Sequence, residues 1–295
     1  MGEIRNYLIA GHKVTVDSYD TLPDGVDPMP SFKPFLSTCE GNAVMHATID
    51  RTYCPNADNL EKTSSFLSNG NDYKMYRRSD GSIMFAIRNC NHSPLAIIDM
   101  EPRLTKSHIA VVPYGSADYI RTLSSALLIA YTFATSHLNT LTIHSSTVVY
   151  NGKAYMFLGD SGTGKSTHSQ SWLRNFSGCE LLNDDNPIVR LHEGSATVYG
   201  SPWSGKTPCY KQKNAPIGAM VKLVQAKHNS ISRLGSIDAF THLLSSVSTL
   251  ICDKQTYEST LDSTIRLTET VPVYELENLP DDAAAQLCKS TIVCP

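Results

Sequence analysis

The sequence has no excess of basic residues, and this argues against a protein that binds nucleic acid or a membrane surface. Its 295 residues include 25 Lys and Arg against 28 Asp and Glu, a formal net charge of −3 with neutral histidines. Binding that depends on phosphate contacts needs a basic surplus. We therefore expect neither nucleic acid nor a membrane among its partners.

Long apolar runs and metal-binding cysteine pairs are also missing. The longest mainly apolar stretch, 126–134, is interrupted by Tyr131 and Thr132, whereas a membrane-spanning helix needs about 20 apolar residues. The first residues show no apolar segment of a secretory signal. The eight cysteines include no Cys-x-x-Cys pair, so the spacing typical of zinc sites is absent. Together these absences predict a cytoplasmic location.

What the sequence does have is apolar material for a sizeable core, at 41 % of residues. Residues 1–105 read as short strands and turns, such as a hairpin around Asp80-Gly81. From Ser116 the apolar residues recur every three or four positions, which predicts a helix to about His137. We expect a small β-rich subdomain over 1–105 and a larger domain over 106–295.

The larger domain alternates strand and helix patterns, which favours a mixed α/β fold. Residues 141–150 and 154–158 read as strands joined by an Asn151-Gly152 hairpin turn. A helix over about 165–176 follows. Further on, we expect strands over 219–226 and 271–276 and helices over 236–247 and 281–290.

The most informative segment is the run Gly159-Asp160-Ser161-Gly162-Thr163-Gly164-Lys165-Ser166-Thr167. It satisfies the P-loop pattern and lies between a strand and a helix, where glycines let backbone N–H groups close around phosphate oxygens. We therefore expect this loop to bind ATP, with Lys165 on the β- and γ-phosphates and Ser166 on Mg²⁺. The alternative is an ordinary glycine turn.

Two carboxylates, Asp184 and Asp185, follow Lys165 by nineteen and twenty residues, at the end of a short apolar stretch. Chain geometry would return them to the phosphates, where one could hold Mg²⁺ and the other could accept a proton from a hydroxyl. Adjacent side chains on a strand point to opposite faces, so we expect different roles for the two. A solvated turn before Pro187 is the alternative.

Two further candidates have weaker patterns. His144 lies in a Thr- and Val-rich stretch, where a histidine is a site residue or a hydrogen-bonded core residue. Lys206 lies in a loop between strands, where its cation could reach a transferred phosphoryl group or stay in solvent.

These motifs resemble the HPr kinase/phosphorylase catalytic domain, which is similar in fold to phosphoenolpyruvate carboxykinase. The resemblance covers about residues 141–280. It rests on the P-loop, on the strand ending in Asp184-Asp185 and on His144, fifteen residues before Gly159. It rests also on Ser232-Arg233-Leu234-Gly235 and on Val271-Pro272-Val273, which are similar to two further family segments.

The resemblance implies an ATP- and Mg²⁺-dependent kinase on a P-loop domain with a mixed sheet. On the family match, Asp185 is the general base, Asp184 joins Ser166 on the metal, and His144 and Arg233 belong to the active site. Thr167 replaces a glutamate of the family, and the Pro-Gly-Arg-Asn loop tied to dephosphorylation is absent. The resemblance therefore does not extend to phosphorylase activity.

Several alternatives stay open. The phosphoryl acceptor is a hydroxyl on a protein serine or on a small metabolite, and assembly into a homo-oligomer is undecided. The chain could instead be a nucleotide-binding regulator without turnover, or have a carboxykinase-like activity.

Overall fold

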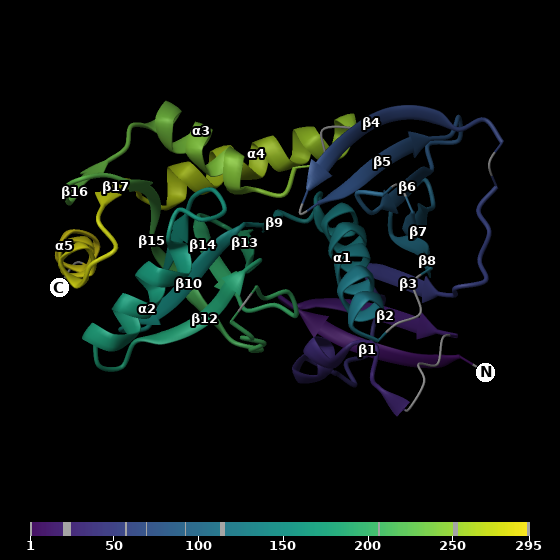
Figure 1. The fold of residues 1–295 in the computed structure, drawn as a ribbon, viewed down its shortest axis with the longest axis horizontal. Coiled ribbons are helices and arrows are strands. Elements are labelled where there is room, and N and C mark those ends of the chain that lie inside the picture. Colours follow the sequence, from purple (N-terminus) through teal and green to yellow (C-terminus); the bar gives the residue numbers. More distant parts are fainter. Residues whose placement is uncertain are drawn as a thin grey trace. The chain divides into compact units, whose positions relative to one another are not determined.

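The chain folds into two compact units, each built on its own β-sheet, in a computed structural model (Figure 1). Unit 1 comprises residues 1–135 and 250–254, and unit 2 comprises residues 136–249 and 255–295. The structure describes residues 2–19, 25–56, 58–68, 70–91, 93–112, 116–205, 207–249 and 253–293. In these ranges, no helix combines the length and the apolar character needed to cross a membrane.

Unit 1 is β-rich, and its described residues form an eight-stranded sheet in the order β1-β2-β3-β8-β7-β6-β5-β4. The strands are β1 (Glu3–Ile9), β2 (His12–Ser18), β3 (Met45–Ile49), β4 (Glu61–Ser68), β5 (Asn71–Arg77), β6 (Ile83–Arg88), β7 (Pro94–Met100) and β8 (Lys106–Val111). A 3-10 helix, η2, spans Pro30–Phe35. Only the β2–β3 and β3–β8 pairs among them are parallel. The expected hairpin around Asp80-Gly81 is present, since Arg77 faces Ile83.

A single long helix, α1 (Ser116–Thr135), packs against β3, β7 and β8 of this sheet. Its buried apolar residues recur at helical spacing, among them Leu123, Leu127 and Tyr131. The expected domain boundary at Thr105 is therefore displaced. β8 and α1 complete the core of unit 1, and the chain passes to unit 2 only after Thr135.

Unit 2 is a mixed α/β unit, and its described residues form a nine-stranded sheet. The main order is β12-β10-β11-β15-β14-β13-β9, with β17 also paired to β15, and β16 to β17. The strands are β9 (Thr140–Thr142), β10 (Ser145–Tyr150), β11 (Lys153–Leu158), β12 (Glu180–Asp185), β13 (Ile188–His192), β14 (Ser195–Tyr199), β15 (Asn214–Gln225), β16 (Ser230–Arg233) and β17 (Val273–Asn278). The helices are α2 (Lys165–Asn175), α3 (Ser236–Ser246), α4 (Lys254–Thr270) and α5 (Asp282–Ile292).

Helices cover both faces of this sheet. Side chains of β11 therefore alternate between two buried clusters, one on each face. Tyr155 and Phe157 face a core that includes Trp172 of α2 and Cys288 of α5. Met156 and its neighbours face the other core, together with side chains of α3 and α4. The result is a three-layer arrangement in which β11 is central.

Two features of unit 2 differ from expectation. The stretch 141–150 is not one strand, since it breaks at Ile143-His144 into β9 and β10. β9 pairs with β13, whereas β10 pairs with β11 and β12. The chain therefore changes its pairing partners at this break. Helix α4 was not expected, because its buried face is mostly hydroxyl-bearing: Thr256, Thr260, Ser263, Thr264 and Leu267.

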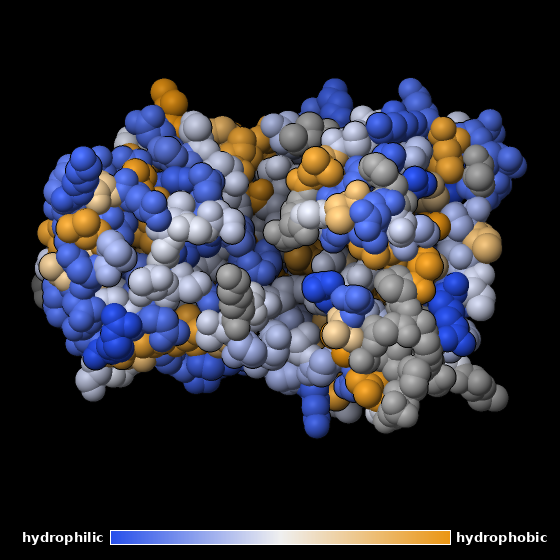
Figure 2. Space-filling model, in the orientation of Figure 1, coloured by the Kyte–Doolittle hydropathy of each residue, from blue (hydrophilic) through white to orange (hydrophobic). Residues whose placement is uncertain are grey.

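The surface in the view of Figure 1 is mixed in character. Figure 2 shows apolar side chains as separate small groups among hydrophilic ones. Scattered apolar residues are normal for a folded protein. This face therefore does not point to a functional site by itself.

Candidate functional site

The glycine-rich loop joins the end of β11 to the start of α2, within a residue of the expected positions. Gly162 and Gly164 have φ values of +87° and +103°, a backbone conformation that favours glycine. Gly159 is constrained by space as well, because a Cβ there would lie 2.7 Å from the Thr163 hydroxyl oxygen. The loop therefore needs these glycines to turn between strand and helix.

Lys165 lies inside this loop rather than in solvent. Its Nζ donates to the carbonyl oxygens of Gly159 at 2.7 Å and of Asp160 at 3.0 Å, and the residue is 9 % exposed. Burial lowers the pKa of Lys165, while the nearby carboxylate of Asp185 opposes that shift. The loop thus encloses a cation whose hydrogen-bond partners are neutral carbonyl groups.

Ser166 is hydrogen-bonded to Asp184, the first residue of the acidic pair. Its hydroxyl donates to Oδ1 of Asp184 at 2.9 Å, and Asp184 is buried at the end of β12. α2 is held to β10 just behind this contact by a 2.6 Å hydrogen bond between the hydroxyls of Ser169 and Ser146. Two hard oxygen donors therefore lie together at the start of α2.

The Ser166 and Asp184 oxygens are only two ligands, which suits a magnesium ion that takes its remaining ligands from phosphate and water. Within the described ranges, no group of three or more His, Cys, Asp or Glu residues is arranged to hold a metal. Mg²⁺ is commonly bound through one or two carboxylates and completed by phosphate and water oxygens. The Ser166 and Asp184 oxygens fit that chemistry.

The second carboxylate, Asp185, pairs with His144. Their Oδ1 and Nδ1 atoms are 3.0 Å apart, and Asn186 donates to the other carboxylate oxygen at 2.8 Å. His144 lies in the break between β9 and β10, where its backbone N–H donates to the carbonyl of Ser246 at 2.7 Å. Both side chains stay partly open, at 41 % and 32 % exposure. The structure therefore brings together His144 and Asp185, two residues that the sequence had singled out separately.

A residue that the sequence analysis missed, Asn183, shapes the end of β12. It is fully buried, and its Oδ1 accepts backbone N–H groups of Asp185 at 3.1 Å and Asn186 at 3.0 Å. Its Nδ2 donates to the Ser201 hydroxyl at 3.2 Å and to the Trp203 carbonyl at 3.1 Å. Asn183 thus fixes the turn that carries Asp185 against the segment 201–205.

That segment lies directly along the acidic pair. Ser204 forms a β-bridge with Asp185, and the N–H of Gly205 donates to the Asp184 carbonyl at 2.8 Å. A Cβ on Gly205 would lie 2.8 Å from the same oxygen, so the approach requires glycine. In the sequence, Gly205 between a serine and a lysine was the available signal. It does not indicate which strand the segment would pack against.

One expected site residue, Arg233, is not joined to this group, and another is not described. Lys206 lies outside the described residues. Arg233 is the last residue of β16, next to Ser232. Paired positions lead from Ser232 across β17, β15, β11 and β10 to Asp185 on β12. Five strand spacings separate them, about 24 Å. The structure therefore places Arg233 across the sheet from the acidic pair.

The comparisons with known proteins include a distant similarity to a solved structure. No family model matches the chain, and no curated protein matches it. The structure of the Hpr(Ser) kinase/phosphatase from Coxiella burnetii is similar with a TM-score of 0.31 and 10 % sequence identity, over 51 % of this chain and 95 % of that one.

Proposed function

We propose that the protein is an ATP- and Mg²⁺-dependent kinase that transfers the γ-phosphoryl group to a hydroxyl. The observation that carries this proposal is the convergence of three groups at the end of β11. They are a glycine-rich loop enclosing Lys165, the Ser166–Asp184 contact, and an Asp185 carboxylate that pairs with His144.

The loop supplies the phosphate contacts. Positive φ values at its glycines would let backbone N–H groups turn toward a bound phosphate, and the N-terminus of α2 adds a partial positive charge. Lys165 would exchange its bonds to the Gly159 and Asp160 carbonyls for bonds to phosphate oxygens. Because its ammonium is partly desolvated, its attraction to phosphate is stronger than it would be in water.

Ser166 and Asp184 would hold Mg²⁺ against the phosphates. When bound, the ion supplies charge neutralisation of the transferred phosphoryl group. The Ser166 hydroxyl now donates to Asp184. In the loaded site, both oxygens would face the metal.

Asp185 would accept the proton of the attacking hydroxyl. As that oxygen bonds to the γ-phosphorus, the bond to the ADP oxygen breaks and the proton passes to the Asp185 carboxylate. His144 orients this carboxylate through its 3.0 Å contact, and Asn186 holds the other oxygen. The partial exposure of both residues leaves room for an acceptor, whether a protein serine or a small metabolite.

The experiment compares Asp185→Asn with Asp184→Asn. ATP consumption is measured with and without candidate hydroxyl compounds, in titrations of acceptor and of Mg²⁺. We expect Asp185→Asn to lower turnover about 10²–10⁴-fold with little change in nucleotide affinity. Asp184→Asn should raise the Mg²⁺ concentration required.

Each contrary result has a distinct meaning. If wild-type protein binds ATP–Mg²⁺ but consumes none with any acceptor, it is a nucleotide-binding regulator instead. If Asp184→Asn alone stops the reaction, the two roles are reversed. If neither substitution has an effect, the kinase proposal is wrong.

A further inference from the structure

A second feature of unit 2 is a cavity on the far side of the glycine-rich loop from the acidic pair. Its volume is about 410 Å³. One wall is the loop at 162–164 together with one side of α2, at Thr167, His168, Ser171 and Arg174. The other wall is formed by the ends of β15 and β17, at Gln225-Ala226 and Asn278–Asp281. Since β12 and β15 lie on opposite sides of β11 in the sheet, the loop separates this cavity from Asp184 and Asp185.

The polar groups of this cavity include the hydroxyls of Thr167 and Ser171, the amide of Gln225 and two acceptors, Asn278 Oδ1 and the Asp281 carboxylate. Asn278 is 6 % exposed and its Oδ1 has no hydrogen-bond partner among the described residues, while its Nδ2 donates to the Leu279 carbonyl at 3.0 Å. Asp281 adds a carboxylate, whose Oδ1 already accepts from the Ala284 N–H at 2.8 Å and from Asn229 Nδ2 at 3.0 Å. Arg174, which also lines the cavity, is already paired with Asp282 at 3.0 Å. A phosphate is therefore poorly suited to this cavity, whereas an uncharged group with N–H or O–H donors is well suited.

We propose that this cavity holds the nucleoside of the nucleotide whose phosphates lie in the loop, and that it favours a base with an exocyclic amino group. The inference rests on the proposed nucleotide site. With the γ-phosphate beside Asp185, the phosphate chain crosses the loop and the nucleoside emerges on the opposite side. The cavity lies at that place, and its volume is within the range of small-molecule sites.

Asn278 gives the expected selectivity. A buried acceptor without a partner destabilises the protein, and an amino N–H of the base would satisfy it. Purine riboside triphosphate is ATP without the exocyclic amino group, and its base has no other N–H, so it would leave this acceptor unsatisfied. We therefore expect wild-type protein to bind ATP at least about tenfold more tightly than purine riboside triphosphate.

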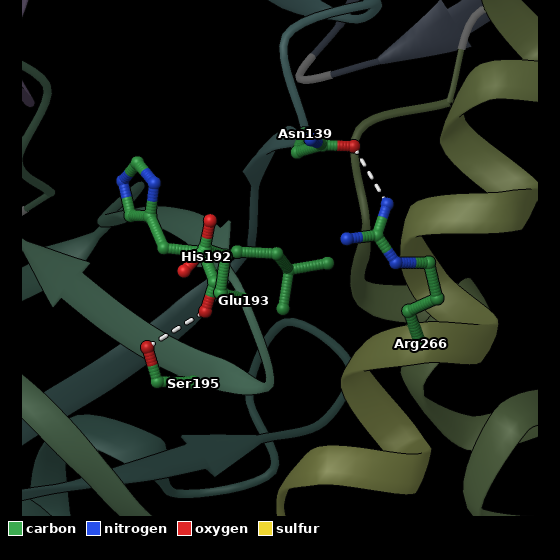
Figure 3. Close-up of a pocket in the computed structure, with 6 residues that line it drawn as sticks. Asn139, His192, Glu193, Ser195 and Arg266 are labelled. Carbon is green, nitrogen blue, oxygen red and sulfur yellow. Dashed lines mark hydrogen bonds between the residues drawn. The ribbon is translucent and has the colours of Figure 1, made fainter.

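The main test fills the cavity and leaves the loop unchanged. Ala226→Phe places a ring at the end of β15. The matched control is Ser195→Phe, which adds the same ring in another cavity of unit 2, of about 690 Å³ (Figure 3). There Arg266 is bonded to Asn139 at 2.8 Å, and Ser195 lies at the opposite wall. Calorimetry measures binding of Mg²⁺–ATP and of Mg²⁺–tripolyphosphate, which has no nucleoside.

We expect Ala226→Phe to weaken ATP binding at least about tenfold, down to the affinity for tripolyphosphate. Tripolyphosphate binding should change less than about twofold, and Ser195→Phe should affect neither ligand. Unchanged ATP affinity in a folded Ala226→Phe protein overturns the cavity assignment and leaves the loop assignment intact. If wild-type protein binds neither ligand, the proposed nucleotide site fails, and this inference fails with it.

A second measurement needs no variant, and it decides the matter if Ala226→Phe does not fold. Wild-type protein is photolabelled with 8-azido-ATP in the presence of Mg²⁺ and digested. Labelled peptides that contain residues 167–174, Gln225-Ala226 or Asn278–Asp281 support the inference, since each of these segments lines the cavity. Labelling confined to peptides outside this lining, or equal affinity for ATP and purine riboside triphosphate, overturns it.

Discussion

Each unit encloses charged side chains, but their partners differ. In unit 1, Arg78 donates to both carboxylate oxygens of Asp99, at 2.7 and 3.0 Å, and the Tyr53 hydroxyl donates to the same carboxylate at 2.7 Å. Burial and this contact raise the pKa of Tyr53 to about 12. In unit 2, Lys165 is bonded to neutral carbonyls and Asp184 to a neutral hydroxyl.

The difference separates a structural cluster from a candidate site. The Arg78–Asp99 pair neutralises itself, and a ligand would have to break an ion pair to enter. The charges of unit 2 have partners that a charged ligand can replace without leaving an opposite charge unpaired. Buried charge alone therefore does not indicate function, and the neutral partners of Lys165 and Asp184 are what make the loop a candidate site.

The largest effect that this comparison of buried charges predicts is on turnover, from Lys165→Met. Loss of the ammonium removes charge stabilisation of the phosphoryl group, and we expect ATP consumption to fall about 10²–10³-fold. Because burial lowers the pKa of Lys165, removing its charge should leave the melting temperature unchanged or higher. Turnover assays and thermal unfolding measure the two effects, with exposed Lys153→Met as control. Wild-type turnover in the Lys165 variant would contradict the proposed phosphate contact.

Arg78→Met in unit 1 should lower stability, whereas Lys165→Met should lower turnover without lowering stability. It leaves the Asp99 carboxylate buried, at 10 % side-chain exposure, without its cation. We expect the free energy of unfolding to fall by about 3–5 kcal/mol. Urea denaturation measures this, and Arg103→Met, at an exposed position, should change stability by less than about 0.5 kcal/mol. If Arg78→Met is as stable as wild type, the cluster in unit 1 is not a structural ion pair.

A pH experiment sharpens the contrast, because the buried pair of unit 1 is ionic while the buried His168 of unit 2 is held neutral. Burial lowers the pKa of His168 from 6.5 to about 4. Below pH 6.5 the unfolded chain binds a proton that the folded protein does not bind until about pH 4. This histidine therefore lowers the free energy of unfolding by about 3 kcal/mol as the pH falls through that window.

His168→Gln is the matched variant for this experiment. The Trp172 indole N–H, which donates to Nε2 of His168 at 3.1 Å, can donate to the glutamine oxygen instead. The difference in stability between wild type and variant, measured by urea denaturation from pH 7 to pH 4, should change with pH by that amount. A constant difference would show that His168 is not held neutral by burial.

The sequence could predict the loop because the determinants of the loop are local. The glycine pattern, the strand before it and the helix after it lie within one continuous segment, and Asn151-Gly152 forms its turn with φ values of +50° and +75°. The position of Asp184 and Asp185 at the end of a strand was equally local. Their roles, and the place of the nucleotide, stay predictions.

What the sequence could not give depends on partners far along the chain. The break at His144 arises because β9 and β10 pair with different strands. Helix α4 presents threonines to the core, whose hydroxyls bond back to carbonyls four residues earlier, as Thr264 does to Thr260 at 2.7 Å. No apolar periodicity marks such a helix. The place of Arg233, expected from a short resemblance, likewise depended on strand order.

The smallest expected effect compares two asparagines that make the same turn contact in different surroundings. Asn89 of unit 1 accepts the backbone N–H groups of Asn91 at 3.0 Å and Ser93 at 2.9 Å near solvent. Asn183 accepts two such groups while buried, and it also donates to Ser201 and Trp203. Water can replace the Asn89 side chain but cannot easily reach the groups that Asn183 satisfies.

We expect Asn89→Ala to lower the free energy of unfolding by less than about 1 kcal/mol, and Asn183→Ala by about 1–3 kcal/mol. Because Asn183 fixes the turn that carries Asp185, its loss should also lower kcat while nucleotide affinity changes little. Asn183→Asp keeps the acceptor but loses the Nδ2 donor, so it should recover part of kcat. Urea denaturation and steady-state kinetics of the three variants measure these effects. Equal losses of stability at the two positions would remove the distinction between a surface turn and a turn that positions the acidic pair.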